Sequence, residues 1–219
     1  MTDSFKEKFR QAVAETEAVV YSYLPEETGH QKTIFEAMNY SVKAGGKRLR
    51  PLLMREVYRL FGGNGPEIGP FMAAMEMIHT SSLIHDDLPC MDNDEYRRGK
   101  LTTWKAYGYD MAVLAGDALM IYAFEVASKA FTMGADPAKV GRAIGILAEK
   151  TGIYGMIGGQ TVDVELTGKA VPREKLDFIY RLKTGALLES SMMIGAVLAG
   201  ASDEEIREVE TMASEVGLA

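Results

Sequence analysis

Residues 77–100 read MIHTSSLIHDDLPCMDNDEYRRGK, an apolar helical pattern that changes abruptly into acids and then bases. The stretch from Glu67 to Leu88 is rich in Met, Ala, Ile and Leu and has few helix breakers, which predicts one long, mostly buried helix. Pro89 is expected to end or kink it, because the proline ring clashes with the carbonyl four residues earlier and donates no hydrogen bond. A polar loop over roughly 89–101 is expected to follow.

The rest of the chain is also predicted to be helical. Apolar residues return to one helical face through residues 3–24, and Gly- or Pro-containing breaks separate the later segments. No segment alternates like a sustained strand, and no Pro-, Gly- or Ser-rich linker divides the chain. We therefore expect a single all-α domain over residues 1–219, a bundle of long helices. The further helices are predicted at 31–43, 48–61, 103–132, 137–166, 172–200 and 203–217.

Composition excludes several classes of protein. The 219 residues carry a net charge of −7, which argues against a nucleic-acid-binding surface. Cys90 is the only cysteine, so no internal disulfide can form, and the first residues lack the apolar core of a signal peptide. The longest apolar stretch, 192–201, is about half of what a membrane span needs. We expect a soluble, cytoplasmic protein without a transmembrane segment.

The acidic cluster predicts a metal site. Five carboxylates lie within residues 86–95, and Asp86 and Asp87 stand at the negative end of an apolar helix, where a cation would compensate them. On an uninterrupted helix Asp86 and Asp92 would lie about 240° apart, but Pro89 lets the chain fold back so that both can reach one ion. Oxygen ligands suit Mg²⁺, and an EF-hand calcium loop is disfavoured because Arg97 would replace its glycine. The alternative is a solvated acidic loop that caps the next helix.

Two basic groups accompany the acids. Lys47, Arg48 and Arg50 surround the expected start of a helix, where the helix dipole and free N–H groups already attract anions. Three cations there favour a phosphate site, and Gly46 permits close approach of the backbone to a ligand. Arg97 and Arg98 form the second group, and arginine's planar fork suits phosphate oxygens. A solvated face with incidental salt bridges is the alternative for each group.

Three further polar residues interrupt apolar helices without being specific by themselves. His79 lies on the same side of the long helix as Asp86, seven residues later, and is either a phosphate donor or a satisfied core histidine. Asp163 is a candidate partner for a lysine or a backbone N–H. Lys183 is either functional or extends its amine to the surface.

Taken together, these motifs resemble the trans-isoprenyl diphosphate synthases, the polyprenyl synthetase family that includes farnesyl and geranylgeranyl diphosphate synthases. The similar segments follow one another in the family's order and cover nearly the whole chain. They are GGKRLRP (45–51), MIHTSSLIHDDLPCMDNDEYRRGK (77–100), LAGDAL (114–119), GGQTVD (158–163) and KTGAL (183–187).

The resemblance implies the isoprenoid synthase fold, all-α helices around a central cavity, usually as a homodimer. It implies a Mg²⁺-dependent prenyltransferase of isoprenoid biosynthesis that joins isopentenyl diphosphate to dimethylallyl, geranyl or farnesyl diphosphate in a 1′-4 head-to-tail condensation. Asp86 and Asp92 would coordinate magnesium, with Asp87 supporting them. Isopentenyl diphosphate would be bound by Lys47, Arg50, His79 and Arg98, and Gly46 is a further substrate-binding candidate. The allylic diphosphate would be bound by Arg97, Lys183 and Thr184, and Gln160 would lie near the reacting carbons.

The resemblance also bears on product length. An aromatic residue five positions before the first aspartate typically limits the family's products to fifteen carbons, and Ser81 stands there in this chain. A small side chain leaves a deeper pocket, which favours a twenty-carbon geranylgeranyl product over farnesyl. Both lengths stay open, because other residues can close a pocket.

One departure from the family pattern concerns the C-terminus. The second aspartate-rich motif, normally introduced by Phe-Gln, is expected directly after Ala219, where the sequence stops. We expect a truncated form of a longer enzyme, incomplete at its C-terminus, with little turnover of its own. Two alternatives remain: a non-catalytic partner subunit of a prenyl synthase, and a class I terpene cyclase. A cyclase, with one diphosphate substrate, would have no clear use for Lys47, Arg50 and His79.

Overall fold

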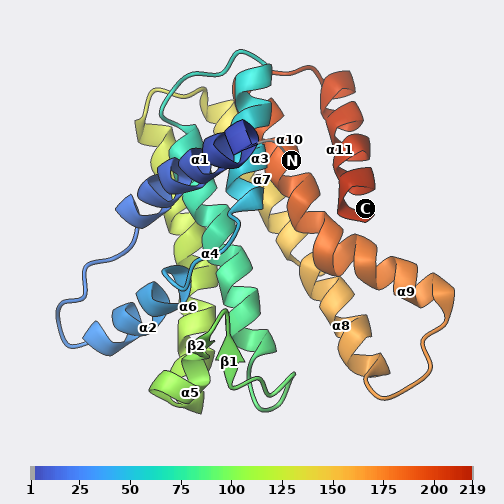
Figure 1. The fold of residues 1–219 in the computed structure, drawn as a ribbon. Coiled ribbons are helices and arrows are strands. Elements are labelled where there is room, and N and C mark those ends of the chain that lie inside the picture. The colour runs from blue at the N-terminus through green and yellow to red at the C-terminus, as the bar shows by residue number, and fades with distance from the viewer. Residues whose placement is uncertain (1–2, 219) are drawn as a thin grey trace. The chain divides into compact units, whose positions relative to one another are not determined.

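The computed structural model describes residues 3–218, and helices make up most of it (Figure 1). The chain divides into two compact units. The first comprises Met1–Leu49 and Ala73–Ala127, and the second comprises Arg50–Met72 and Ser128–Ala219. The predicted all-α class is confirmed, whereas the expectation of one domain over residues 1–219 stays a prediction.

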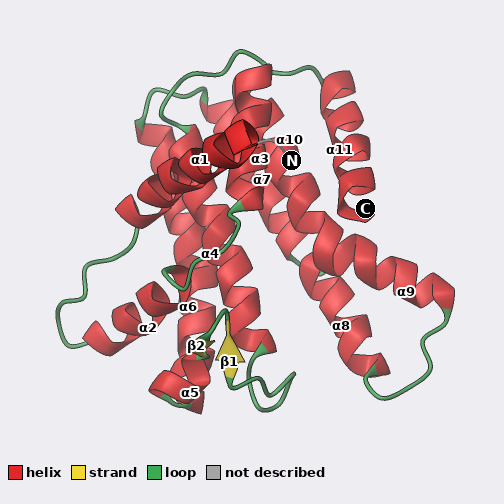
Figure 2. Cartoon of the chain, viewed as in Figure 1, coloured by secondary structure: helices red, strands yellow, loops and turns green. Residues whose placement is uncertain are grey.

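The first unit is organised around helix α4, which spans Ile68–Asp86 and enters this unit at Ala73. Met75, Met77 and Ile78 are fully buried, as expected for a helix that is apolar on all sides. Its other elements are α1 (Asp3–Ser22), α2 (Lys32–Val42), β1 (Tyr96–Arg97), β2 (Lys100–Leu101), α5 (Thr103–Tyr107) and nearly all of α6 (Tyr109–Ser128). Figure 2 shows that the strands are confined to this short hairpin in the described part of the chain.

The second unit is organised around helix α10 (Ala186–Ala199), which is buried from Ala186 to Leu198 apart from Leu188. Gly195 lets α10 approach α3 closely, because a Cβ there would collide with the Met54 carbonyl. The remaining elements are α3 (Leu49–Leu60, of which Leu49 belongs to the first unit), η1 (Lys129–Thr132), α7 (Pro137–Thr151), α8 (Met156–Leu166), α9 (Arg173–Ile179), the π-helical turn η2 (Tyr180–Gly185) and α11 (Asp203–Leu218).

The predicted helix boundaries are correct to within about two residues at most ends, but two long helices were predicted without their interruptions. The expected helix 103–132 is broken at Gly108, whose φ of +100° favours glycine. The expected helix 137–166 is broken between Thr151 and Met156. The apolar pattern continues across both glycine-containing segments. Periodicity alone therefore did not predict that the helices end there.

Two helical stretches are long and apolar enough to cross a membrane by length and composition: Tyr109–Thr132 and Arg173–Ala199. In the structure 39% and 67% of their apolar windows are buried. The core helix of a soluble protein passes the same test, so these stretches are weak evidence for a membrane span. The expectation of no transmembrane segment stays a prediction.

Candidate functional site

The end of α4 brings the predicted metal ligands together through the backbone. The helix ends at Asp86, and the Asp92 N–H then donates to the Asp86 carbonyl at 2.9 Å. Met91 and Asn93 both donate to the Leu88 carbonyl, at 2.8 and 3.1 Å. The chain therefore folds back immediately after the helix, as the position of Pro89 predicted, and residues 86 and 92 become neighbours.

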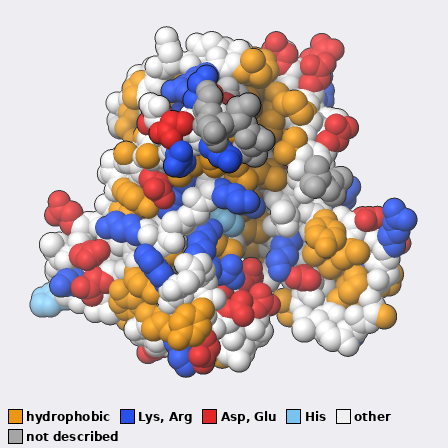
Figure 3. Space-filling view, in the orientation of Figure 1, with side chains coloured by type: hydrophobic (Ala, Val, Ile, Leu, Met, Phe, Trp, Pro, Cys, Tyr) orange, Lys and Arg blue, Asp and Glu red, His pale blue; other side chains and the backbone are white. Residues whose placement is uncertain are grey.

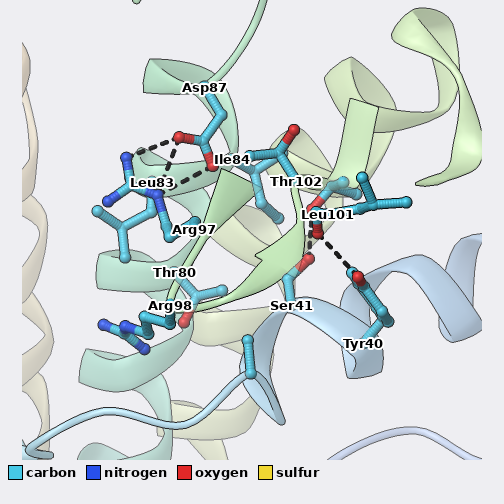
Figure 4. A pocket seen from close by; sticks show the side chains of 12 residues that line it. Tyr40, Ser41, Thr80, Leu83, Ile84, Asp87, Arg97, Arg98, Leu101 and Thr102 are labelled. Atoms are coloured by element: carbon cyan, nitrogen blue, oxygen red, sulfur yellow. Dashed lines mark hydrogen bonds and ion pairs between the residues drawn. The ribbon is translucent and has the colours of Figure 1, made fainter. Parts of the chain in front are cut away.

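Asp87 points into the protein and binds Arg97. Its side chain is 4% exposed and accepts hydrogen bonds from Arg97 Nε at 2.9 and 3.0 Å and from an Arg97 terminal nitrogen at 2.6 Å (Figure 4). Burial raises the pKa of Asp87, while the hydrogen bonds and charge of Arg97 oppose that rise. The hydrogen bond to Asp87 in turn raises the pKa of Arg97. The predicted supporting acid thus holds the arginine predicted to bind the allylic diphosphate.

A two-residue turn explains why the adjacent arginines reach different partners. Arg98 and Gly99 have φ angles of +53° and +77°, the left-handed pair that closes a tight hairpin. Tyr96 pairs with Leu101 and Arg97 with Lys100 across the two strands. Arg97 therefore lies on a strand and reaches Asp87, whereas Arg98 lies in the turn and extends away from it (Figure 4).

Arg98 extends to the glycine loop that precedes α3. One of its guanidinium nitrogens donates to the Gly45 carbonyl. A Cβ on Gly46 would lie 2.7 Å from an Arg98 guanidinium nitrogen, so the glycine makes room for that side chain. Lys47 follows on the exposed surface. The hairpin turn thus brings Arg98, predicted to bind isopentenyl diphosphate, against Gly46, a predicted substrate-binding residue that directly precedes Lys47.

The interpretation of Arg48 as part of an anion site is wrong. Its side chain has no exposed surface, and its nitrogens are bound by Glu17, Tyr21, Glu76 and the Val42 carbonyl. Burial leaves the guanidinium inaccessible to a ligand. The run of three cations did not reveal this, because nothing in the local sequence separates an inward arginine from an outward one.

Two histidines of α4 have different surroundings. His79 is half-buried and lies one turn after the buried Glu76, and its predicted role in binding a phosphate stays a prediction. His85 packs against α6, where Gly116 leaves space for its ring, and its Nε2 lies 3.5 Å from Asp117 Oδ1. The LAGDAL segment therefore supplies a close contact to the helix turn that carries Asp86.

The second unit holds the other predicted group. Lys183 Nζ donates to Asp163 Oδ2 at 2.6 Å, so Asp163 is a lysine partner, one of the two roles considered from sequence. Lys183 and Thr184 lie in η2, and Gln160 lies on α8 with Asp163. A Cβ on Gly159 would collide with the Lys183 backbone nitrogen, so this glycine permits the close contact of α8 with η2. Arg50 begins the second unit in the first turn of α3.

The donor set at the end of α4 fits Mg²⁺ better than other metals. No group of three or more His, Cys, Asp or Glu residues in the described part of the chain forms a complete metal cage. Magnesium does not require one, because it commonly binds one or two carboxylates and takes its other ligands from water and phosphate oxygens. Asp86 and Asp92 would provide such a pair, and Asp87, which binds Arg97, would support them.

Basic and acidic side chains lie next to each other at the end of α4, an arrangement that suits an anionic ligand bound through a metal cation. Figure 3 shows Lys and Arg side chains gathered beside a group of Asp and Glu side chains where α4 ends and the hairpin begins. Beneath this surface lies a small cavity of about 30 Å³ whose lining includes Tyr40, Thr80, Asp87, Arg97 and Arg98. Its volume suits a water molecule at most, so the anion would bind at the exposed arginines.

Sequence reasoning missed one residue of this region. Glu76 is 3% exposed and binds Arg48 at 2.6 Å. The signal was present, because Glu76 is the single acid between Ile68 and Asp86, one turn before His79. An isolated acid on a buried helix requires a buried cation, and Arg48 is that cation.

Comparisons with known proteins identify the family of the chain. A family model described as polyprenyl synthetase matches residues 31–219. The farnesyl diphosphate synthase of Geobacillus stearothermophilus is 43% identical over 218 residues, which cover 99% of this chain and 72% of that protein. The chloroplastic geranylgeranyl pyrophosphate synthase of Capsicum annuum is 49% identical over 186 residues, which cover 84% of this chain and 50% of that protein.

A solved structure gives the same result for the fold. The apo structure of an FPP/GFPP synthase from Zymomonas mobilis is similar with a TM-score of 0.92 and 36% identity, covering all of this chain and 79% of that one. The chain spans about half the length of several of the curated relatives that it matches. With a family model that covers most of its residues and a relative matched along almost its whole length, this chain belongs to the polyprenyl synthetase family.

Proposed function

We propose that the protein is a short-chain trans-prenyl diphosphate synthase that condenses isopentenyl diphosphate with an allylic diphosphate. The observation that carries the proposal is the arrangement at the end of α4: Asp86 and Asp92 become neighbours through the Pro89 turn, and Arg97 of the hairpin binds Asp87 between them in the sequence. Relatives named as farnesyl and geranylgeranyl diphosphate synthases support it.

The reaction follows from the charges. The allylic C–O bond breaks, and diphosphate leaves with the bonding electrons. The double bond of isopentenyl diphosphate attacks the allylic carbocation to form the new C–C bond, and a proton is then lost to the released diphosphate. Arg97, held by Asp87, and Lys183, held by Asp163, would stabilise the leaving diphosphate. Lys47, Arg50, His79 and Arg98 would hold isopentenyl diphosphate, and Thr184 and Gln160 would contact the allylic substrate.

Asp86 and Asp92 would hold Mg²⁺, which neutralises charge on the diphosphate when bound. The chain's own contribution is to position these carboxylates and to keep Asp87 for Arg97. We propose in addition that residues of the first and the second unit act in the same reaction. The order of the motifs along the chain, which is that of the family, supports this.

We propose that the protein is a homodimer and that it is cytoplasmic. We also propose that it has no nucleic-acid partner and no transmembrane segment. The exposed face of α6 supports self-association, because Leu114 and Ile121 are 55% and 72% exposed one above the other on that face. The acidic net charge of −7 supports the exclusion of nucleic acid.

Product length is proposed as twenty carbons. Ser81 is fully buried in α4 and donates its hydroxyl to the Ile78 carbonyl. Ser81→Phe is expected to shorten the longest product by one isoprene unit, because the larger side chain would occupy pocket space. Ser81→Ala is the control, and chromatography of the dephosphorylated products gives the length. An unchanged product from a folded Ser81→Phe variant would show that other residues set the length.

The function is tested by incubating the protein with Mg²⁺, labelled isopentenyl diphosphate and each allylic primer in turn. Both the 219-residue chain and the full product of its gene are assayed. Asp86→Ala is expected to abolish the turnover found for the wild type, with Glu95→Gln on the nearby exposed hairpin as its control. Full activity in Asp86→Ala would contradict the assigned metal site. If the gene product forms no prenyl diphosphate from any primer, the synthase proposal fails, and a non-catalytic partner subunit becomes the better interpretation.

A further inference from the structure

Arg48 is the most completely bound cation described in the first unit. Its four contacts are Glu17 at 3.0 Å, Glu76 at 2.6 Å, the Tyr21 hydroxyl at 3.1 Å and the Val42 carbonyl at 2.7 Å. Its φ of +50° is unusual for a residue other than glycine and persists only where the surroundings determine it. Four polar contacts from a residue with a strained backbone indicate that the Arg48 side chain has a specific structural role.

The first consequence of these contacts is the shape of the glycine loop. The bond from Arg48 to the Val42 carbonyl closes residues 42–48 into a loop, with Gly45 and Gly46 at left-handed φ angles of +88° and +143°. The Gly45 carbonyl then accepts the hydrogen bond from Arg98. Arg48 therefore holds the acceptor on which Arg98 rests.

The second consequence concerns the charge of Glu76. This carboxylate is 3% exposed and also acts on Arg98, because its negative charge raises the pKa of that guanidinium against the desolvation that lowers it. Arg48 acts in the opposite direction on the same group. Glu76 thus has two arginines within electrostatic reach, and in this structure its hydrogen bond goes to the buried one.

We propose that Arg48 is a positioning residue for Arg98: by neutralising Glu76, it keeps that carboxylate from drawing Arg98 off the Gly45 carbonyl and away from an incoming diphosphate. The proposal rests on the proposed function for the identity of the diphosphate. Without the Arg48 charge, Glu76 would be a buried, unpaired carboxylate, which is costly. Arg98, on which the charge of Glu76 already acts, is the other cation that would then pair with it. The effect on the substrate would then be the loss of one charged phosphate contact.

The test separates charge from packing with three variants. Arg48→Gln removes the charge but keeps a donor for Glu76. Arg48→Lys keeps the charge but loses the planar fork. Arg48→Gln/Glu76→Gln removes both charges and keeps an amide pair in their place. KM for isopentenyl diphosphate, KM for the allylic diphosphate, kcat and the melting temperature are measured for each variant and the wild type.

Arg48→Gln is expected to raise KM for isopentenyl diphosphate about tenfold or more, the loss of a hydrogen bond to a charged group, while the allylic KM and kcat change less than about threefold. The double variant and Arg48→Lys are expected to keep that KM within about threefold of the wild type, even where they lower the melting temperature. A KM that follows the melting temperature across all three variants, or that stays high in the double variant, would overturn the proposal.

A crystal structure of Arg48→Gln keeps this test separate from the proposed function. It is expected to show the Arg98 guanidinium bound to Glu76, and an Arg98 that still rests on Gly45 would contradict the positioning role. Wild-type turnover is assayed first. Its absence would refute the synthase activity, whereas the position of Arg98 in the variant would still decide the role of Arg48.

Discussion

At the scale of single residues, the Asp87–Arg97 pair shows how the chain orients an arginine beside an anion site. Asp87 is nearly inaccessible, whereas Arg97 is 31% exposed, so one partner is fixed and the other can contact a ligand. A carboxylate that accepts two parallel N–H groups sets the plane of the guanidinium as well as its position. Orientation by Asp87 is therefore a separate contribution from the charge of Arg97 itself.

Asp87→Asn is expected to lower the free energy of unfolding by about 1–3 kcal/mol, because a charged hydrogen-bond pair is lost while Arg97 can still be hydrated. We also expect KM for the allylic diphosphate to rise, since Arg97 is no longer held in one plane. Urea unfolding and steady-state kinetics measure the two effects. Glu95→Gln removes an exposed ion pair with Lys105 and is expected to cost less than about 1 kcal/mol. Equal losses in the two variants would argue against a special role for Asp87.

The structure around the site was predictable from the sequence where it depends on neighbouring residues of the chain. The Pro89 turn followed from the clash of the proline ring, and the neighbouring backbones of residues 86 and 92 confirm it. The inward direction of Arg48 was not predictable from its neighbours, because it depends on Glu17 and Glu76, which lie 31 and 28 residues away. The separate partners of Arg97 and Arg98 likewise depend on a hairpin of only two residues per strand, too short to give an alternating pattern.

At the scale of elements, the π-helical turn η2 is the feature that periodicity missed. Six residues, Tyr180–Gly185, adopt it inside the helical stretch predicted at 172–200. A π-turn changes which side chains share a face, and such turns often occur at functional sites. Here it carries Lys183 against α8 and Asp163. A continuous 3.6-residue pattern could not reveal this, because the charged segment before the turn, REKLDFI, and the apolar segment after it, ALLESSMMIGAVLA, are both compatible with an unbroken helix.

Gly159→Ala is expected to disrupt the contact of α8 with η2. The added Cβ would collide with the Lys183 backbone nitrogen and lie 2.9 Å from the Leu182 carbonyl carbon, so backbone would have to move. Overpacking of this kind typically costs about 1–3 kcal/mol, and we expect reduced kcat because Lys183 shifts. Gly145→Ala on α7 is the matched control: nothing lies within 4 Å of its Cβ, and alanine favours a helix. A stable, fully active Gly159→Ala variant would refute the close contact.

Lys150 links three helices of the second unit. Its amine binds Glu189 of α10 at 2.5 Å and Glu210 of α11 at 2.6 Å, and the Lys150 and Glu189 side chains are only 17% and 8% exposed. Lys150→Met leaves a buried carboxylate without its partner, which is expected to cost about 3–5 kcal/mol. Arg142→Ala, which removes the exposed pair with Asp203, is the control and is expected to cost less than about 1 kcal/mol.

The same contact predicts a dependence of stability on pH. Burial lowers the pKa of Lys150, but the hydrogen bonds and charges of Glu189 and Glu210 outweigh it, so the pKa is raised above 10.5. A raised lysine pKa gives stability that is complete below about pH 10.5 and is lost as the pH rises through the folded-state value. The stability gap between the wild type and Lys150→Met, measured by urea unfolding, is therefore expected to narrow above that pH. A gap that stays constant to pH 12 would contradict the assignment.

At the scale of the whole molecule, the question is whether the exposed face of α6 contacts another protein or a membrane. Leu114 and Ile121 are exposed, and this stretch passes the length and composition test for a span. Asp110, Asp117 and Glu125 are exposed on the same helix at spacings that place them along the same face. Carboxylates interleaved with aliphatic residues would be costly in a hydrocarbon core, whereas a protein interface accommodates them with paired or hydrated groups.

Ile121→Glu is therefore expected to convert a dimer into monomers, because it adds a like charge beside Asp117 and Glu125 and removes the most exposed aliphatic group of this face. Sedimentation velocity of the wild type should give twice the mass of one chain, and that of the variant the mass of one. Leu60→Glu replaces a leucine that is 75% exposed at the end of α3 and serves as the control for a general effect of added charge. A variant that remains dimeric would place the interface elsewhere. Wild-type monomers that co-sediment with lipid vesicles, and lose this binding on Ile121→Glu, would instead assign the face to a membrane, against the argument from the three carboxylates.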